Sequence, residues 1–237
     1  LANGSIDGFI MALLAETQKR QDFNHLREGT EQGIPLVLFD RVTDQIACDK
    51  VIIDDEAAGR DATRRLLESG RRRVALFTTQ SYLNVSAKRE VGYRKALEAA
   101  GLQVDPELIL RLPYQYEEEQ ASEAFFKSRK FDAVLCVNEI FAIRGMRLAI
   151  KLGLRVPEDV AFIGFTDGIL SRYSTPSLTT VDQRGEAMGE RAAEMLIQKV
   201  EDRFDEVDPT QFRTEVIPVQ LIERESAVLG KPTKADG

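Results

Sequence analysis

Short apolar runs alternate with longer segments in which apolar residues recur at helical spacing along most of the 237 residues. The runs predict strands at 9–13, 35–39, 51–53, 74–77, 108–110, 133–137, 160–164, 178–181 and 215–222. The longer segments predict helices at 22–32, 56–69, 87–100, 117–127, 139–152 and 186–201. This alternation is typical of an α/β protein with mostly parallel sheets and helices on both faces.

The segment 156–181 carries the most functional information. A turn at Pro157 leads into the strand at 160–164, which ends at Thr166, Asp167 and Gly168. A polar loop then separates this strand from the strand at 178–181. Open α/β sheets bind ligands where strand ends present polar side chains to a crevice. The pattern therefore predicts a binding site at the end of this strand.

Composition and charge narrow the classes of function. The net charge is −7, whereas a surface that binds the phosphate backbone of DNA is usually basic. This chain by itself is therefore a poor candidate for DNA binding. The basic cluster at 71–73 lies between a helix and a strand, where solvated charges are common. No apolar run approaches the roughly 20 residues that cross a bilayer, and the first residues show no signal peptide. Two cysteines, Cys48 and Cys136, are too few for a disulfide framework, which favours the reducing cytoplasm.

Catalytic and metal chemistry find little support in the sequence. His25 is the only histidine and has no partner at metal-ligand spacing, so multi-histidine metal sites are largely excluded, as are histidine-based triads. His25 lies in a polar predicted helix, which favours a surface role over a catalytic one. A Ser–Lys dyad stays open on residue counts, but no motif suggests one. No glycine-rich phosphate loop is present. We therefore expect no metal, no cofactor and no enzymatic activity.

Seven segments together resemble one known family. They are IDGFI at 6–10, GIPLVLFDR at 33–41, the helix and strand at 59–75, REVGYRKAL at 89–97, VPEDVAFIGFTDG at 156–168, PSLTTV at 176–181 and MGERAA at 188–193. The same motifs in the same order mark the effector-binding domain of the LacI/GalR family of bacterial transcription regulators. One difference is Arg71, which stands where the family usually has histidine.

The resemblance implies two α/β lobes of the type I periplasmic-binding-protein kind, with the effector between them. It assigns 1–50 and 182–209 to the N-terminal lobe, and 51–181 and 210–222 to the C-terminal lobe, which leaves 223–237 as a tail. Family members begin with a helix-turn-helix head and two further βα units. This sequence contains neither, so we expect an N-terminal lobe that is truncated.

The resemblance also implies a function. The chain would be the effector-sensing and dimerisation domain of a cytoplasmic regulator that binds a sugar or sugar phosphate. It would form a homodimer, contact operator DNA only through the absent head, and have no membrane partner. A periplasmic sugar-binding protein for transport is the first alternative, and it would need an export signal. An enzyme on the same fold is the second, but the sequence lacks any paired-acid, nucleophile–base or metal arrangement.

Three strand-end or helix-start residues are implied as ligand contacts. The carboxylate of Asp40 can accept hydrogen bonds from adjacent sugar hydroxyls, although aspartate is also common in turns. Arg89, in the first turn of its helix, offers a planar fork that suits a diol, carboxylate or phosphate; the alternative is a solvated helix face. Asn138 can combine a helix N-cap with a ligand contact.

Four further residues complete the implied site. Thr166 and Asp167 stand where the family has two aspartates, and the hydroxyl of Thr166 carries no charge. Tyr116, with Tyr114, offers an aromatic wall for a sugar face, or else is a partly buried loop residue. Gln183 aligns with a polar residue near the hinge.

Overall fold

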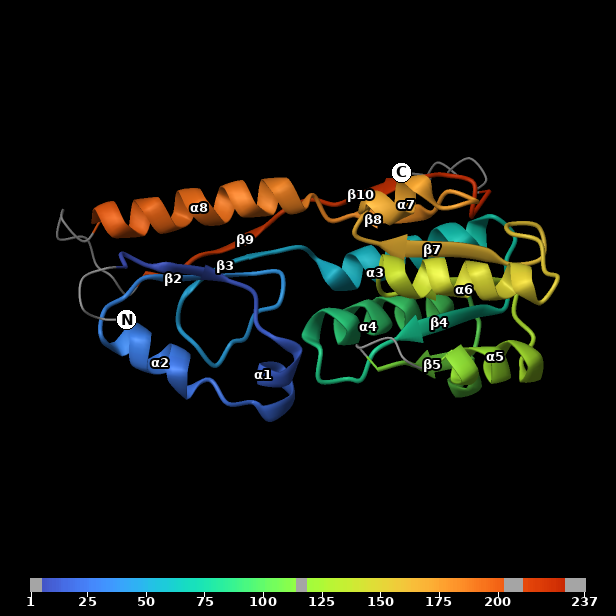
Figure 1. Ribbon diagram of the computed structural model, residues 1–237, viewed down its shortest axis with the longest axis horizontal. Coiled ribbons are helices and arrows are strands. Elements are labelled where there is room, and N and C mark those ends of the chain that lie inside the picture. The colour runs from blue at the N-terminus through green and yellow to red at the C-terminus, as the bar shows by residue number, and fades with distance from the viewer. Residues whose placement is uncertain (1–5, 114–118, 203–210, 229–237) are drawn as a thin grey trace. The chain divides into compact units, whose positions relative to one another are not determined.

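The computed structural model describes residues 6–113, 119–202 and 211–228 (Figure 1). Its backbone divides into two compact units. Unit 1 contains Leu1–Asp54, Tyr82–Val85 and Arg184–Pro218, and unit 2 contains Asp55–Ser81, Ser86–Gln183 and Val219–Gly237. Each unit has its own sheet, so each is described separately.

The sheet of unit 1 is parallel, with strand order β1-β2-β3-β9. Its strands are β1 (Phe9–Met11), β2 (Leu36–Phe39), β3 (Asp49–Ile52) and β9 (Thr214–Val216). Helix α8 (Gly185–Asp202) lies along one face, and α1 (Ala15–Arg20) and α2 (Asn24–Glu31) lie on the other (Figure 1). Phe23 and Leu26 pack with Leu38 in a core on the α2 side, which explains how so polar a helix is anchored.

Unit 2 has a six-stranded sheet with order β10-β8-β7-β6-β4-β5. Its strands are β4 (Val74–Thr78), β5 (Ile109–Arg111), β6 (Ala133–Cys136), β7 (Ala161–Phe165), β8 (Thr179–Asp182) and β10 (Gln220–Ile222). All neighbours are parallel except the edge strand β10, which is antiparallel to β8. Every residue of β4, β6 and β7 is buried, as expected for parallel strands covered on both faces.

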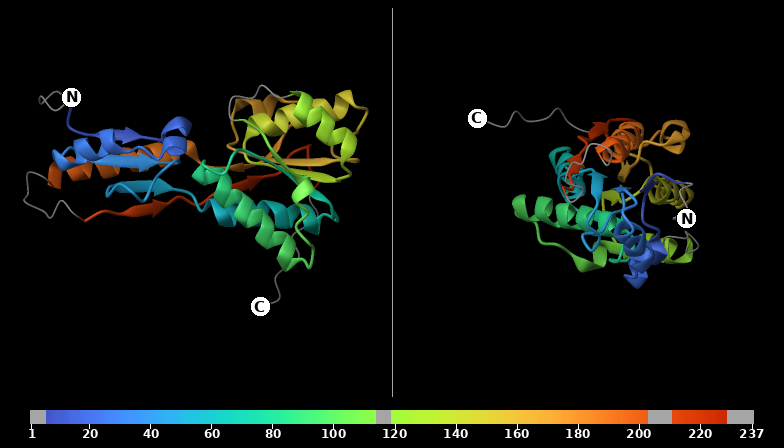
Figure 2. Two further views of the ribbon diagram at one scale, coloured as in Figure 1. Left: turned by 90° about the horizontal axis from the view of Figure 1, so that it is seen from below. Right: turned by 90° about the vertical axis from the view of Figure 1, so that its left-hand side faces the viewer.

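Helices cover both faces of this second sheet. They are α3 (Asp55–Glu68), α4 (Asn84–Ala99), α5 (Glu119–Ser128), α6 (Glu139–Lys151) and the short α7 (Ile169–Tyr173), with a 3₁₀ turn at Pro106–Leu108. Helices α3 and α4 lie on one face, and α5 and α6 on the other (Figure 2). The predicted fold class, mostly parallel sheets with helices on both faces in two α/β units, is confirmed.

The two units differ from the predicted domain boundaries at 51–54, 82–85, 182–183 and 211–218. The predicted strand at 51–53 belongs to unit 1, because β3 pairs with β2 through Val37–Asp49 and its neighbours. The predicted strand at 215–222 is two strands in different sheets, β9 beside β3 and β10 beside β8. Pro218 lies between them and has no N–H to continue a ladder, which explains the break.

Residues 223–228 do not behave as a tail. The Ser226 hydroxyl is fully buried, donates to the Phe162 carbonyl at 2.7 Å and accepts from the Thr179 N–H at 2.8 Å. Ala227 is buried in the core of unit 2. These contacts join the end of the described chain to β7 and β8.

The sequence patterns did not predict two of the helices. α1 and α7 have six and five residues, too few for a helical period to show. Helix α4 begins at Asn84, which places Arg89 in its second turn and not in the first. The position of Arg89 in the second turn determines which groups its side chain can reach.

Candidate functional site

The strand order of unit 2 defines where its parallel sheet opens at the carboxyl ends. The chain leaves β4 for β5 on one side, and leaves β6 for β7 on the other. Counted within unit 2, the five parallel strands therefore have the doubly wound order 2-1-3-4-5, which places the topological switch point between β4 and β6. Ligands of open α/β sheets bind outside the carboxyl ends at such a point.

Arg89 reaches this switch point from the second turn of α4. Its Nη1 donates to the carbonyl of Val137, the residue after β6, at 2.6 Å. Its Nε and Nη2 lie 2.8 and 2.7 Å from Oδ1 of Asp55, the first residue of α3. The guanidinium also lies over the Phe165 ring at the end of β7, 4.0 Å from its centroid. Arg89 is thus fixed by three different elements and is buried, so the solvated-face alternative is excluded.

The ion pair leaves Arg89 with unused donors. A guanidinium has five N–H groups, and the contacts to Asp55 and Val137 use three of them. The other two have no partner within the described residues. The opposite charges of Arg89 and Asp55 cancel, and their side chains, each 4% exposed, are shielded from water. Such a pair can donate to hydroxyl groups without adding net charge to the site.

Asn138 lies next to this pair in the chain and caps α6. Its Oδ1 accepts a hydrogen bond from the Phe141 N–H at 2.8 Å, which confirms the predicted N-cap. The cap uses the side-chain oxygen and leaves the amide group as donor. Because Arg89 holds the carbonyl of the preceding residue, Val137, both side chains lie at the carboxyl end of β6.

Thr166 and Asp167 follow β7 and have different surroundings. Thr166 is exposed, and its hydroxyl donates to Oε1 of Gln183 at 3.0 Å. The side chain of Asp167 is only 6% exposed and is held in ion pairs by Arg224 at 2.6 Å and Arg172 at 3.3 Å. Thr166 and Gln183 therefore form an accessible polar pair, whereas the Asp167 carboxylate ties the β7 end to Arg224.

The backbone at this strand end is strained. Thr166 has a φ of 105° and Asp167 a φ of 55°, both in the range that favours glycine. A β-branched residue at positive φ is a real outlier, and strain of this kind costs about 1–3 kcal/mol per residue. Strained residues cluster at ligand sites, which supports the assignment of a site here.

Replacing Thr166 by glycine should therefore raise the free energy of unfolding by about 1 kcal/mol. Relief of the strain exceeds the roughly 0.5–1 kcal/mol that glycine costs through chain entropy. Urea denaturation of both chains measures the change. Thr43→Gly, at a residue whose φ is not positive, is the control and should be destabilising. Equal losses for both variants would contradict the strain argument.

Asp40 belongs to unit 1. It follows β2 with a φ of 56°, and its N–H donates to the Val51 carbonyl at 3.0 Å. One carboxylate oxygen lies 3.7 Å from Nε of Arg41. The turn role of Asp40 is therefore present, and a ligand contact stays a prediction. Tyr116, with Tyr114, lies outside the described residues.

The sequence patterns missed three residues at the site. Asp55 is one, and the others are Arg111 at the end of β5 and Glu90 on α4, which form an ion pair at 2.8 Å. Burial alone raises the pKa of Glu90, but hydrogen bonds from Arg111 and Arg94 outweigh it, so its pKa is lower than usual. An arginine that ends a short apolar strand is the one signal that pointed to this pair.

The basic cluster at 71–73 is engaged with the backbone. The Arg71 side chain donates to the carbonyls of Pro157 and Glu158, Arg72 to that of Leu67, and Arg73 to that of Lys130. These hydrogen bonds give the three arginines a structural role within unit 2.

Within residues 6–113, 119–202 and 211–228, no group of three or more His, Cys, Asp or Glu side chains is placed to hold a metal ion. The helices described there include none that is long and apolar enough to span a membrane. Both cysteines are buried, and burial raises the pKa of Cys48 to about 11.

A doubly wound sheet with arginine, asparagine and a strained polar turn at its carboxyl edge defines a ligand-binding α/β domain. Residues 63–227 match the family described as periplasmic binding protein-like domain. The chain belongs to this family, in the form found as the effector-binding domain of LacI/GalR regulators.

The relatives are transcription regulators. The chain is 31% identical over 223 residues to the HTH-type transcriptional repressor PurR of Aliivibrio fischeri strain MJ11, covering 92% of the chain and 64% of the repressor. It is 32% identical over 202 residues to the regulator CelR of Thermobifida fusca, covering 83% of the chain and 57% of CelR. A solved CelR–cellobiose complex superposes with a TM-score of 0.80 at 28% identity, covering 95% of the chain and 67% of that structure. The chain thus spans less than two thirds of the length of these two regulators.

Proposed function

We propose that the chain is the effector-sensing and dimerisation part of a cytoplasmic DNA-binding transcription regulator. Its effector is a small polar ligand, a sugar or sugar phosphate. The observation that carries the proposal is Arg89, held at the switch point of unit 2 with two donors unused. Asn138, Thr166 and Gln183 supply further neutral polar groups at the same sheet edge.

The chemistry of these groups fits a polyhydroxylated ligand. A neutral Arg89–Asp55 pair, an amide and a hydroxyl can form hydrogen bonds with the hydroxyl groups of a ligand. None of these groups requires the ligand to carry a net charge. The relatives support this class, because CelR has been solved with cellobiose. They also favour regulation over transport, since PurR and CelR are both named as HTH-type regulators. Enzymatic activity has no support from either.

In the complete regulator the effector would act by shifting a conformational equilibrium. A ligand that binds one arrangement more tightly raises its population, by no more than its differential affinity allows. Dimeric helix-turn-helix proteins read two half-sites at fixed spacing, so a change in that arrangement alters operator affinity. In this proposal operator contact lies in the head and not in the described residues.

A thermal-shift screen of this chain tests the effector class. The compounds screened are cellobiose, ribose and glucose 6-phosphate. A compound that binds should stabilise the chain by about 2.7 kcal/mol when its concentration is a hundred times its own dissociation constant. Asn138→Asp is the matched variant, because aspartate keeps the N-cap acceptor but removes the amide donors. A ligand that stabilises the parent chain more than this variant supports the site. Stabilisation that is identical in both chains would place the ligand elsewhere, and no stabilisation by any sugar would reject the effector class.

The dimer is supported by an exposed apolar surface on α7. Ile169, Leu170 and Tyr173 are 71%, 43% and 81% exposed. Contiguous exposed apolar residues mark interaction surfaces, and a symmetric dimer uses the same surface of each copy. We therefore assign α7 to the interface with a second copy.

Replacing Ile169 and Tyr173 together by aspartate should weaken the dimer at least tenfold. Each new carboxylate would lose its water on association, and the two copies would bring like charges together. Sedimentation equilibrium over a concentration series measures the dissociation constant. Val91→Asp, at an exposed apolar position of α4, is the control and should leave it unchanged. An unchanged constant for the α7 variant would remove α7 from the interface.

A further inference from the structure

Helices α3 and α4 cross at two glycines. A Cβ at Gly59 would lie 2.5 Å from the Arg89 carbonyl oxygen, and one at Gly92 would collide with the backbone of Glu56 and Arg60. The helices are therefore in backbone contact at this point. Towards their C-terminal ends they leave a cavity of about 380 Å³ between them.

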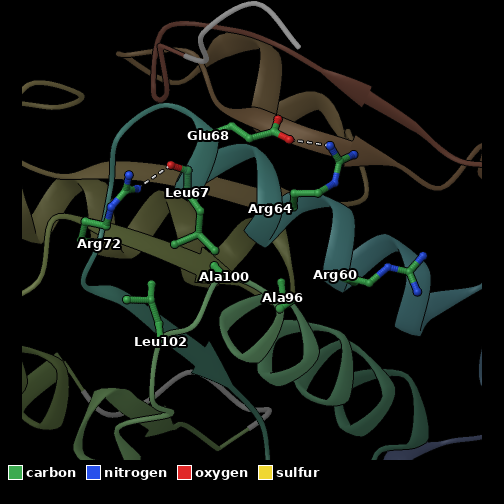
Figure 3. A pocket seen from close by; sticks show the side chains of 9 residues that line it. Arg60, Arg64, Leu67, Glu68, Arg72, Ala96, Ala100 and Leu102 are labelled. Atoms are coloured by element: carbon green, nitrogen blue, oxygen red, sulfur yellow. Dashed lines mark hydrogen bonds and ion pairs between the residues drawn. The ribbon is translucent and has the colours of Figure 1, made fainter. Parts of the chain in front are cut away.

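The floor of this cavity is apolar. Leu67 of α3 and Leu102, which follows α4, point into it with Ala96 and Ala100 (Figure 3). Small alanine side chains on the α4 side leave the space open. A volume of this size falls within the range of small-molecule sites, which are mostly apolar with a few polar groups.

Three arginines and one glutamate line the cavity as well. Arg60 and Arg64 are one helical turn apart on α3, and their side chains are 45% and 50% exposed. The Arg60 guanidinium has only Asp61 near it within the described residues, at 3.7 Å. Arg64 is turned towards Glu68, 2.7 Å away, and Arg72 is fixed on the Leu67 carbonyl (Figure 3). Arg64 also lies 3.7 Å from Asp61, so Arg60 is the less engaged of the two cations, and a ligand would share Arg64 with Glu68 and Asp61.

We propose that this cavity is a second ligand site, which takes a small carboxylate with an apolar body. The body would lie on Leu67 and the alanines, and the carboxylate would pair with Arg60 and Arg64. The positive excess in the lining, within a chain of net charge −7, selects for an anion. Arginine forks match the geometry of a carboxylate. The site goes beyond the proposed effector function, since no residue of the β4–β6 switch point lines it.

The test uses 2-naphthoate as probe and the whole chain labelled with ¹³C at the alanine methyl groups. We expect saturable shifts at Ala96, Ala99 and Ala100, with a dissociation constant of about 1 mM or less, and none at Ala192 in α8. The uncharged 2-naphthalenemethanol should bind at least tenfold more weakly. Arg60→Gln/Arg64→Gln should also weaken naphthoate at least tenfold, whereas Arg20→Gln/Arg27→Gln in unit 1, with the same change of net charge, should not.

A substitution at Glu68 should have the opposite effect on naphthoate binding to the arginine substitutions. Glu68→Gln removes the nearer of the two carboxylates that pair with Arg64 and should tighten naphthoate binding severalfold, while Arg65, the other partner of Glu68, keeps its ion pair with Glu223. Ala100→Phe should block the cavity and abolish the shifts at Ala96. The proposal is overturned if the floor alanines do not shift, or if the alcohol and the acid bind equally well. It is also overturned if the Arg60/Arg64 double variant binds naphthoate as the parent does.

Discussion

Replacing Arg89 by alanine is expected to lower the free energy of unfolding by about 3–5 kcal/mol, and to abolish stabilisation by any effector. Removing one partner of a buried ion pair leaves the other charge uncompensated, and that penalty has this size. Here the remaining charge is Asp55, 4% exposed, and the Val137 carbonyl also loses its donor. Urea denaturation followed by circular dichroism measures the loss.

A second variant separates the charge effect from lost packing. Because Asp55→Asn removes the stranded charge, Arg89→Ala/Asp55→Asn should be less destabilised than the sum of the two single variants, with a coupling of about 0.5–3 kcal/mol. Arg155→Ala, which breaks the exposed pair with Asp159, is the control and should change stability far less. Additive effects at Arg89 and Asp55 would contradict a buried, coupled pair.

Replacing Gly92 by alanine is expected to destabilise the chain by about 3 kcal/mol. The new methyl group would collide with backbone atoms of Glu56 and Arg60, and backbone in the middle of a helix cannot move aside cheaply. Overpacking of a tight contact typically costs about 1–3 kcal/mol, and more where the neighbours cannot relax. Thermal and urea unfolding both report the loss.

Gly189→Ala is the matched control for the helix crossing. Gly189 lies within α8, and a Cβ there would meet nothing within 4 Å. Alanine should therefore stabilise the chain by about 0.5–1 kcal/mol through helix propensity alone. If Gly92→Ala shifted stability in the same direction as Gly189→Ala, the α3–α4 contact would be wrong.

Local patterns predicted much of unit 2. The apolar runs that became β4, β6 and β7 are buried on both faces, so their sequences are continuous and easily found. Asn138 was predicted as an N-cap because a strand end followed by a helix start is visible in sequence. The seven family motifs added the order of these elements and the candidate ligand residues.

The assignment of β3 and β9 to unit 1 needed the tertiary structure. Both are short, and their pairing, Lys50 with Thr214 and Ile52 with Val216, joins segments about 160 residues apart along the chain. No local pattern encodes such a partner. Helix α7 was missed for a different reason: its five residues make fewer than two helical turns, which is too short for a helical pattern to show.

The sequence by itself determined the α/β class, the family and the strand ends where polar side chains gather, because these depend on local periodicity and ordered motifs. Only the tertiary structure decided what those side chains do. It placed Arg89 against Asp55 and Val137, and it committed Asp167 to Arg224. It also opened a cavity beyond the crossing of Gly59 and Gly92. Ion pairs and helix contacts of this kind depend on distances between residues far apart in the chain, which periodicity does not specify.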